Sequence, residues 1–166
     1  PLVAGQLDPG PHAERLAAFE GVPRAPALLR QRAAAQTQGA RVINLASSAA
    51  FYGQADLAGY SASKFFVKGL TEALNIEWQT QGICVRDILP LFVQTAMVKG
   101  VDIGSIQRLG VNLQPEDVAA VIWRATQHPG YGKVHWPVGL QANFLYKLGA
   151  ITPDWLNRAI ARMIAM

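Results

Sequence analysis

The chain has 166 residues, of which 51% are hydrophobic and 16% charged, a composition typical of a folded domain rather than a disordered chain. Its formal net charge of +4 comes from scattered lysines and arginines, without a basic run, which argues against a nucleic-acid surface. One cysteine, Cys84, excludes an internal disulfide, and three widely spaced histidines argue against a metal site.

Residues 1–40 differ in composition from the rest of the chain. They contain five of the ten prolines and show no alternating strand pattern. One helix is predicted at about Ala27–Gln36, with Pro26 at its start and Gly39 beyond its end. The remainder of this segment is expected to be an irregular, poorly ordered lead-in to a second region, residues 41–166.

Strand and helix patterns alternate from Arg41 onward. Short apolar runs rich in β-branched residues predict buried strands, and longer amphipathic runs predict helices. In chain order, the pattern predicts a strand at 41–47, a helix from 57 or 60 to about 80, a strand at 83–89, a mobile loop with short helical turns at 92–113, a helix at 115–127, a strand at 133–138, and helices at 140–150 and 153–166. This order predicts an α/β fold with a parallel sheet and right-handed crossovers.

The first long helix is predicted to carry an apolar stripe at helical spacing, formed by Phe66, Leu70, Ala73 and Leu74. Gly82 ends this helix.

Tyr60 and Lys64 lie four residues apart near the start of that helix, and therefore on one face of it. A lysine cation close to a phenol favours the phenolate, which suits a general acid or base. Ser47 precedes Tyr60 by 13 residues and lies at the C-terminal end of the first predicted strand, the edge where parallel sheets bind ligands. A hydroxyl there could hold a substrate oxygen against Tyr60. The tyrosine–lysine pair alone is weak evidence for a catalytic site, and the serine at this spacing strengthens that evidence.

A different chemistry fits part of the same stretch. Ser61 to Lys64, "SASK", satisfies the S-x-x-K pattern of penicillin-binding serine enzymes. The S-D-N and K-T-G motifs that accompany it are missing, and a parallel α/β context argues against a serine hydrolase.

Three motifs follow one another along the chain: "VINLASS", "YSASKFFVKGLTEALNIEW" and "DILPLFVQTAMV". Together they closely resemble the short-chain dehydrogenase/reductase family over roughly residues 40–166. The resemblance implies a partial Rossmann-like fold, a doubly wound parallel sheet truncated at its N-terminal half, because three strands are fewer than the five or six that are typical.

The resemblance also implies a role for each matching residue in the interconversion of a carbonyl and an alcohol. Tyr60 matches the acid/base of hydride transfer. Lys64 matches the residue that lowers the pKa of the tyrosine and binds the nicotinamide ribose. Ser47 matches the serine that positions the substrate, and Ser48 is its neighbour and alternative. The segment beside the nicotinamide is matched by Pro90, Val93 and Thr95, with Leu91 where many members have glycine.

The cofactor implied by the resemblance is NAD or NADP, and the sequence does not identify which. The glycine-rich turn that would bind the pyrophosphate is absent, since Gly5, Gly10, Gly21 and Gly39 are too far apart to build one. This absence favours an alternative interpretation: a non-catalytic fragment that lacks the cofactor site of such an enzyme.

The expected substrate is a small carbonyl compound or alcohol, and an apolar one, because residues 91–113 carry few charges. A homo-oligomer is expected for the intact family form, without a nucleic-acid partner. No apolar run has the length of a membrane span, and the first residues do not resemble a signal peptide, so a cytoplasmic protein without an integral membrane segment is expected.

Overall fold

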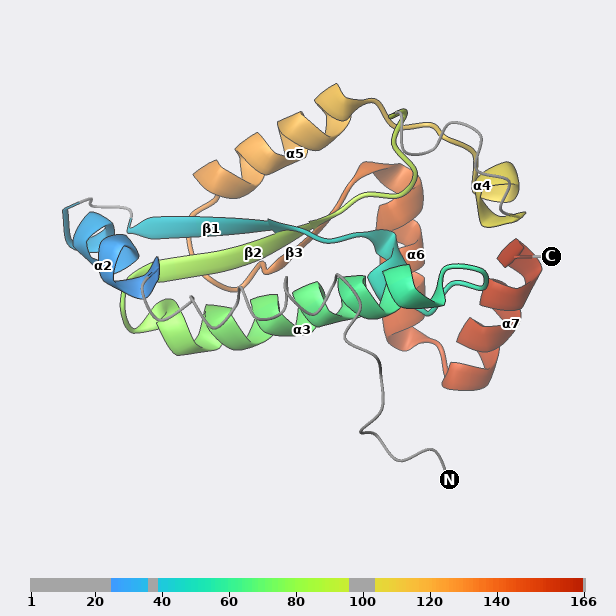
Figure 1. Cartoon of the computed structure of the whole chain (residues 1–166), viewed down its shortest axis with the longest axis horizontal. Helices are drawn as coiled ribbons and strands as arrows, with labels where there is room; N and C mark the ends of the chain where they lie inside the picture. Colours follow the sequence, from blue (N-terminus) through green and yellow to red (C-terminus); the bar gives the residue numbers. More distant parts are fainter. Residues whose placement is uncertain (1–24, 36–38, 96–103, 166) are drawn as a thin grey trace.

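A three-stranded parallel sheet forms the centre of the protein in a computed structural model that describes residues 25–35, 39–95 and 104–165 (Figure 1). The strands are β1 (Ala40–Leu45), β2 (Ile83–Leu89) and β3 (His135–Pro137), in the order β1-β2-β3. Both neighbouring pairs are parallel, with Ala40 opposite Ile83 and Asp87 opposite His135. The predicted parallel α/β fold is confirmed. The predictions for residues 1–24 and for the loop at 96–103 lie outside the described residues.

The helices follow the sequence predictions closely. They are α2 (Ala25–Ala35), α3 (Ala58–Gln79), α4 (Gly104–Leu109), α5 (Pro115–Gln127), α6 (Gly139–Ile151) and α7 (Asp154–Ala165). In Figure 1, α3 and α5 lie on opposite sides of the sheet, while α4, α6 and α7 gather beyond one end of it. Gly82 ends the turn after α3 with a φ of 72°, a left-handed backbone that glycine adopts without strain.

All seven residues of β2 are buried, because the strand is covered on both faces. Ile83 and Val85 pack towards α3 with Trp78, whereas Ile88 packs with Val121 of α5. This alternation places two charged side chains in the interior on opposite faces. Both Arg86 and Asp87 have 0% of their surface exposed.

Arg86 lies on the α5 side and bonds to main-chain oxygens at the end of that helix. Its guanidinium donates to the carbonyl oxygens of Ala125, His128 and Gly130. A cation there is favourable because the C-terminal end of a helix carries partial negative charge. Arg86 thus joins the centre of the sheet to the turn after α5.

The inner face of α3 differs from the apolar stripe that the sequence predicts. Phe66 is 41% exposed and Ala73 is also exposed, whereas Leu74 packs on the core. The buried positions of α3 are Ser61, Thr71, Asn75 and Trp78. Polar residues are tolerated there because they bond to the strands: Asn44 Nδ2 donates to Thr71 Oγ1 at 2.9 Å, and Asn75 Nδ2 to the Val85 carbonyl oxygen at 2.7 Å.

Candidate functional site

Ser47 lies just beyond the C-terminal end of β1, where the sequence predicts it. It is buried and precedes a single 3₁₀ turn, η2 (Ser48–Ala50), which it caps by accepting a hydrogen bond from the Ala49 N–H at 3.2 Å. Its Oγ donates to the carbonyl oxygen of Pro90 over an O–O distance of 3.4 Å. A hydrogen bond of that length is weak, so the hydroxyl can turn to another acceptor at little cost.

Tyr60 and Lys64 are brought together by the first turns of α3. The Lys64 Nζ lies 5.4 Å from the centroid of the Tyr60 ring, and it donates to the carbonyl oxygen of Leu45 at 3.2 Å. The lysine therefore joins the start of α3 to the last residue of β1. Partial burial lowers the pKa of Lys64 from its ordinary value. Tyr60 is 40% exposed, which leaves its side chain open to a ligand.

No hydrogen bond joins Ser47 to Tyr60 among the residues that the structure describes. Both side chains nonetheless belong to segments at the same edge of the sheet, since Lys64 binds Leu45 and Ser47 follows Leu45 by two residues. The arrangement offers a hydroxyl donor, a phenol and an ammonium group at that edge, where open parallel sheets bind ligands.

The segment predicted to lie beside the nicotinamide begins at the same edge. Pro90 is buried, and its carbonyl oxygen accepts a hydrogen bond from the Ser48 N–H at 2.9 Å. Val93 pairs with Leu113 in an isolated parallel bridge and packs on the core. Thr95 is exposed. Pro90 is thus fixed beside the serines, and Val93 is held by the segment that leads into α5.

Ser61 is not arranged as a nucleophile activated by Lys64. It is 4% exposed, and its Oγ accepts a hydrogen bond from the Gln54 N–H at 3.1 Å. The ammonium of Lys64 is directed to Leu45 and Tyr60 instead. This geometry argues against the serine hydrolase interpretation.

A cavity of about 80 Å³, partly open to solvent, lies between the loop after β1 and helices α4, α6 and α7. Ser48 and Leu91 line it, and they directly follow Ser47 and Pro90 in the sequence. The opposite walls include Ser105 of α4 and Ile160 and Ile164 of α7. Helical periodicity shows that a face of a helix is apolar but not what it covers, so the walls of this cavity become visible only in the packed structure.

The described residues show neither a metal cluster nor a membrane-spanning helix. No group of three or more His, Cys, Asp or Glu side chains in 25–35, 39–95 and 104–165 could hold a metal ion. Over the same ranges, none of the helices has the length and apolarity needed to cross a bilayer.

Comparisons with known proteins give a consistent result. The family model for short chain dehydrogenases matches residues 23–104, a range that contains Ser47, Tyr60 and Lys64. A cyclohexanol dehydrogenase of Acinetobacter sp. (strain SE19) is 34% identical over 90 residues, which cover 51% of this chain and 35% of that protein. A 3-oxoacyl-[acyl-carrier-protein] reductase of Rickettsia typhi is 34% identical over 103 residues, which cover 58% of this chain and 43% of that protein. The chain therefore spans less than half the length of these two relatives.

Solved structures share the fold. A short-chain dehydrogenase from Burkholderia cenocepacia in complex with NADP superposes with a TM-score of 0.69 at 19% identity, covering 99% of this chain and 65% of that one. A 3-ketoacyl-(acyl-carrier-protein) reductase from Brucella melitensis complexed with NADH gives a TM-score of 0.58 at 23% identity, covering 73% and 51%. The motifs, the parallel sheet and the match to the family model lead to one conclusion: the chain belongs to the short-chain dehydrogenase/reductase family.

Proposed function

We propose that the protein is an NAD(P)-dependent oxidoreductase that interconverts a carbonyl and an alcohol through Ser47, Tyr60 and Lys64. The observation that carries the proposal is that the Lys64 ammonium lies 5.4 Å from the centroid of the Tyr60 ring while it donates to the Leu45 carbonyl oxygen at the end of β1. A cation close to a phenol favours the phenolate, which is what a tyrosine acid/base requires.

The nicotinamide, when bound, supplies or accepts the hydride, and the side chains of this chain handle the proton. In the reductive direction the Tyr60 phenol donates its proton to the carbonyl oxygen of the substrate, and in the oxidative direction it takes a proton from the alcohol. The Ser47 hydroxyl turns from the Pro90 carbonyl oxygen to the substrate oxygen and stabilises the charge that develops there. Lys64 stabilises the phenolate that Tyr60 leaves behind.

Lys64 also has capacity to hold the cofactor. An ammonium group has three donors, and one of them is directed to Leu45. The others suit the hydroxyls of the nicotinamide ribose, and Pro90, Val93 and Thr95 would lie beside the nicotinamide. The 166 residues contain no glycine-rich turn of the dinucleotide-binding type, so they account for the nicotinamide end of the cofactor only. That gap supports the alternative of a fragment that does not bind the cofactor and is not catalytic.

An apolar substrate is supported by the cavity, whose walls are mainly leucine, isoleucine and alanine side chains. A homo-oligomer is supported by α3, because Phe65, Phe66 and Ile76 are 42%, 41% and 74% exposed. A reducing compartment such as the cytoplasm suits the free, buried Cys84. In this proposal residues 41–166 form the C-terminal part of the family's domain.

Two tyrosine variants test the proposed function. A chimaera that joins the N-terminal segment of the Burkholderia cenocepacia dehydrogenase, which was solved in complex with NADP, to this chain would be assayed for carbonyl reduction by following nicotinamide absorbance. Tyr60→Phe should abolish turnover and leave cofactor affinity nearly intact, whereas Lys64→Ala should damage both. Tyr131→Phe, in the turn after α5, is the matched control and should retain activity. Near-normal turnover by Tyr60→Phe would refute the proposal.

A further inference from the structure

The cavity wall contains a buried hydroxyl without a partner. Ser105, the second residue of α4, is 3% exposed and lines the cavity, yet its Oγ has no hydrogen-bond partner among the described residues. Burying a hydroxyl without a partner is unfavourable, so such groups in folded proteins usually bond to water or to a ligand. Ser105 therefore stands out as a buried polar group to which the described part of the chain supplies no hydrogen bond.

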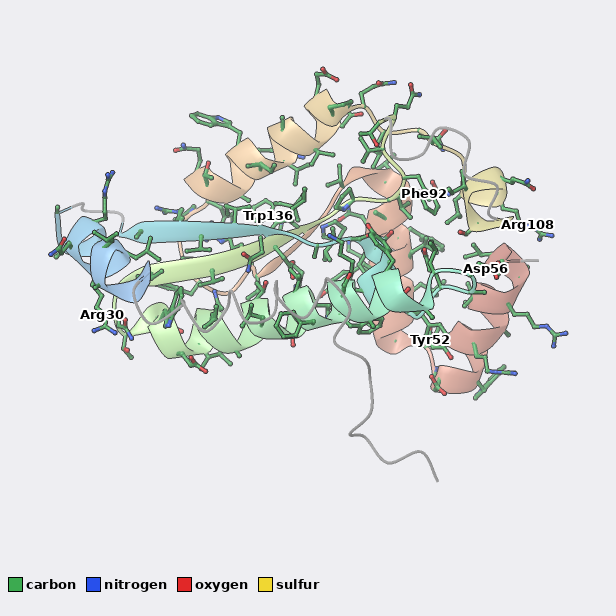
Figure 2. All side chains as sticks on the ribbon, in the orientation of Figure 1. Arg30, Tyr52, Asp56, Phe92, Arg108 and Trp136 are labelled. Carbon is green, nitrogen blue, oxygen red and sulfur yellow. The ribbon has the colours of Figure 1, made fainter. Side chains whose placement is uncertain are left out.

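The position of Ser105 is fixed by contacts on both sides of it. At Gly104 the backbones of α4 and α7 approach so closely that a Cβ atom would overlap the carbonyl oxygen of Ala165. One turn later, Arg108 Nη1 donates to the carbonyl oxygen of Met163 at 2.6 Å, which places it beside the C-terminal end of α7 (Figure 2). These contacts hold α4 against α7, so Ser105 is in place before a ligand arrives.

The surroundings of Ser105 are mainly apolar, although Tyr52 and Gln54 also belong to the cavity lining. The cavity is lined by Leu91, Leu109, Leu145, Leu148, Ile160 and Ile164, among others. Asn157 also lines it, but its amide already donates to the carbonyl oxygens of Gly149 and Thr152. The second serine in the lining, Ser48, follows Ser47 directly, so the cavity reaches from the segment that carries Ser47 to Ser105.

We propose that Ser105 binds a second oxygen of the substrate, remote from the reacting carbonyl, while the apolar body of the molecule fills the cavity. The proposal rests on the proposed function, which places the reacting group at Ser47 and Tyr60. It defines the substrate class as an apolar ketone or alcohol with a further oxygen, and it makes Ser105 a specificity-determining residue. A substrate without that oxygen would leave the hydroxyl of Ser105 without a partner.

The test measures binding to the full 166-residue chain, without cofactor. 2,7-Octanedione and 2-octanone have the same carbon chain and share one ketone, and they differ by a second, remote carbonyl oxygen. Each would be titrated while the methyl signals of Ile160 and Ile164 are followed by NMR. In Ser105→Ala the affinity ratio of 2,7-octanedione to 2-octanone should fall about three- to tenfold, the value of one hydrogen bond. Ser63→Ala, which removes an exposed hydroxyl on α3, is the matched control and should leave the ratio unchanged, and Ser48→Ala, which removes the other serine hydroxyl of the cavity, should lower the ratio less than Ser105→Ala.

Three results would overturn the proposal: an unchanged ratio in Ser105→Ala, an equal fall in Ser48→Ala, or no change in the two isoleucine signals with either compound. None of them depends on turnover. The proposed function fails separately, when Tyr60→Phe keeps its activity, so the two failures can be told apart.

Discussion

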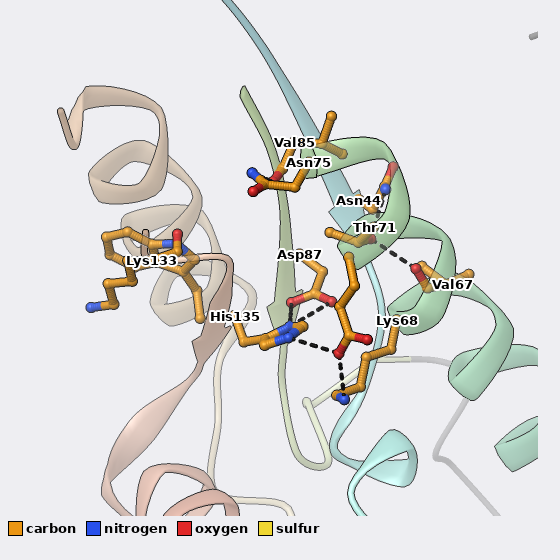
Figure 3. A network of polar contacts seen from close by, with 11 residues as sticks. Asn44, Val67, Lys68, Thr71, Asn75, Val85, Asp87, Lys133 and His135 are labelled. Carbon is orange, nitrogen blue, oxygen red and sulfur yellow. Dashed lines mark hydrogen bonds and ion pairs between the residues drawn. The ribbon is translucent and has the colours of Figure 1, made fainter. Parts of the chain in front are cut away.

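Asp87 of β2 and His135 of β3 are register partners in the parallel sheet, and their side chains meet, with His135 Nδ1 2.9 Å from Asp87 Oδ1 (Figure 3). The other ring nitrogen, Nε2, lies 3.0 Å from Glu72 Oε1 of α3, which Lys68 also contacts at 2.7 Å. The imidazole therefore lies between two carboxyl groups, one on the neighbouring strand and one on α3. The network joins β2, β3 and α3 by polar side-chain contacts.

His135→Gln should destabilise the chain more than Asp87→Asn. Asp87 is fully buried, so removing the imidazole leaves a carboxyl group without its partner, at a loss of about 1–3 kcal/mol in the free energy of unfolding. Asparagine at position 87 leaves no unpaired charge. Urea unfolding of the two single variants and of the double variant would measure this. The double variant should lose less than the sum of the single losses, and strict additivity would show that the two groups are not coupled.

Glu72→Gln should change how stability depends on pH. The hydrogen bond from Lys68 is the main cause that lowers the pKa of Glu72. A carboxyl group with a lowered folded pKa contributes stability above its unfolded pKa, about 4.3, and loses it as the pH falls through the folded value. The stability difference between wild type and Glu72→Gln should thus be constant near neutral pH and shrink as the solution becomes acidic below about pH 4.

Asp87 is coupled to Glu72, whose charge helps to raise the pKa of Asp87. Burial is the main cause of that raised pKa, so the contribution of Asp87 has the opposite sign: it is present below the unfolded pKa and is lost as the pH rises through the folded one. The comparison is therefore also made in an Asp87→Asn background, where the difference with and without Glu72→Gln at each pH carries no contribution from Asp87. Urea titrations at several pH values would supply the data, and a gap that widens in acid would contradict the argument.

The sequence predicts the elements of this fold well but not the partners of its buried polar groups. In "ICVRDIL" the short apolar run indicates a buried strand, and β2 covers those seven residues. The same run does not show how Arg86 and Asp87 are accommodated, because their partners Ala125, Gly130 and His135 lie about 40 or more residues away. Local periodicity carries no information about such contacts.

The candidate site, too, can be predicted from the sequence only in part. Helical spacing predicts that Tyr60 and Lys64 share a face, and the structure places the ammonium near the ring. The bond from Lys64 to Leu45 and the contact of Ser47 with Pro90 could not be read from spacing, since they depend on how α3 and β2 pack beside β1. The sequence does not single out Ser105. Its hydroxyl is of interest because it is buried without a hydrogen-bond partner among the described residues, and only the packed structure shows this.

The 166-residue chain by itself should bind NAD(H) or NADP(H) very weakly or not at all. A dinucleotide is held mainly through its pyrophosphate, by backbone N–H groups of a glycine-rich turn at a helix N-terminus, and this sequence contains no such turn. Isothermal titration calorimetry would decide the point, with the chimaera as the positive control. Micromolar binding by the chain alone would mean that residues 1–40 provide a phosphate site of another kind.

The last prediction separates the two neighbouring serines at the end of β1. Ser47 and Ser48 are both buried, but only Ser47 directs its hydroxyl along a long, weak bond to Pro90, from which it can turn to a substrate oxygen. In the chimaera, Ser47→Ala should lower kcat/KM for carbonyl reduction by roughly 10²–10³-fold, as the loss of one oxyanion donor does elsewhere.

Ser48→Ala should have a milder effect, because the residue contributes its N–H to Pro90 and lines the cavity, and alanine preserves that backbone bond. Cofactor affinity, measured separately, should be unchanged in both variants, since neither hydroxyl is assigned to the dinucleotide. If Ser48→Ala proves the more damaging change, the substrate oxygen binds on the cavity side of the 3₁₀ turn, and Ser47 serves only as the cap of that turn.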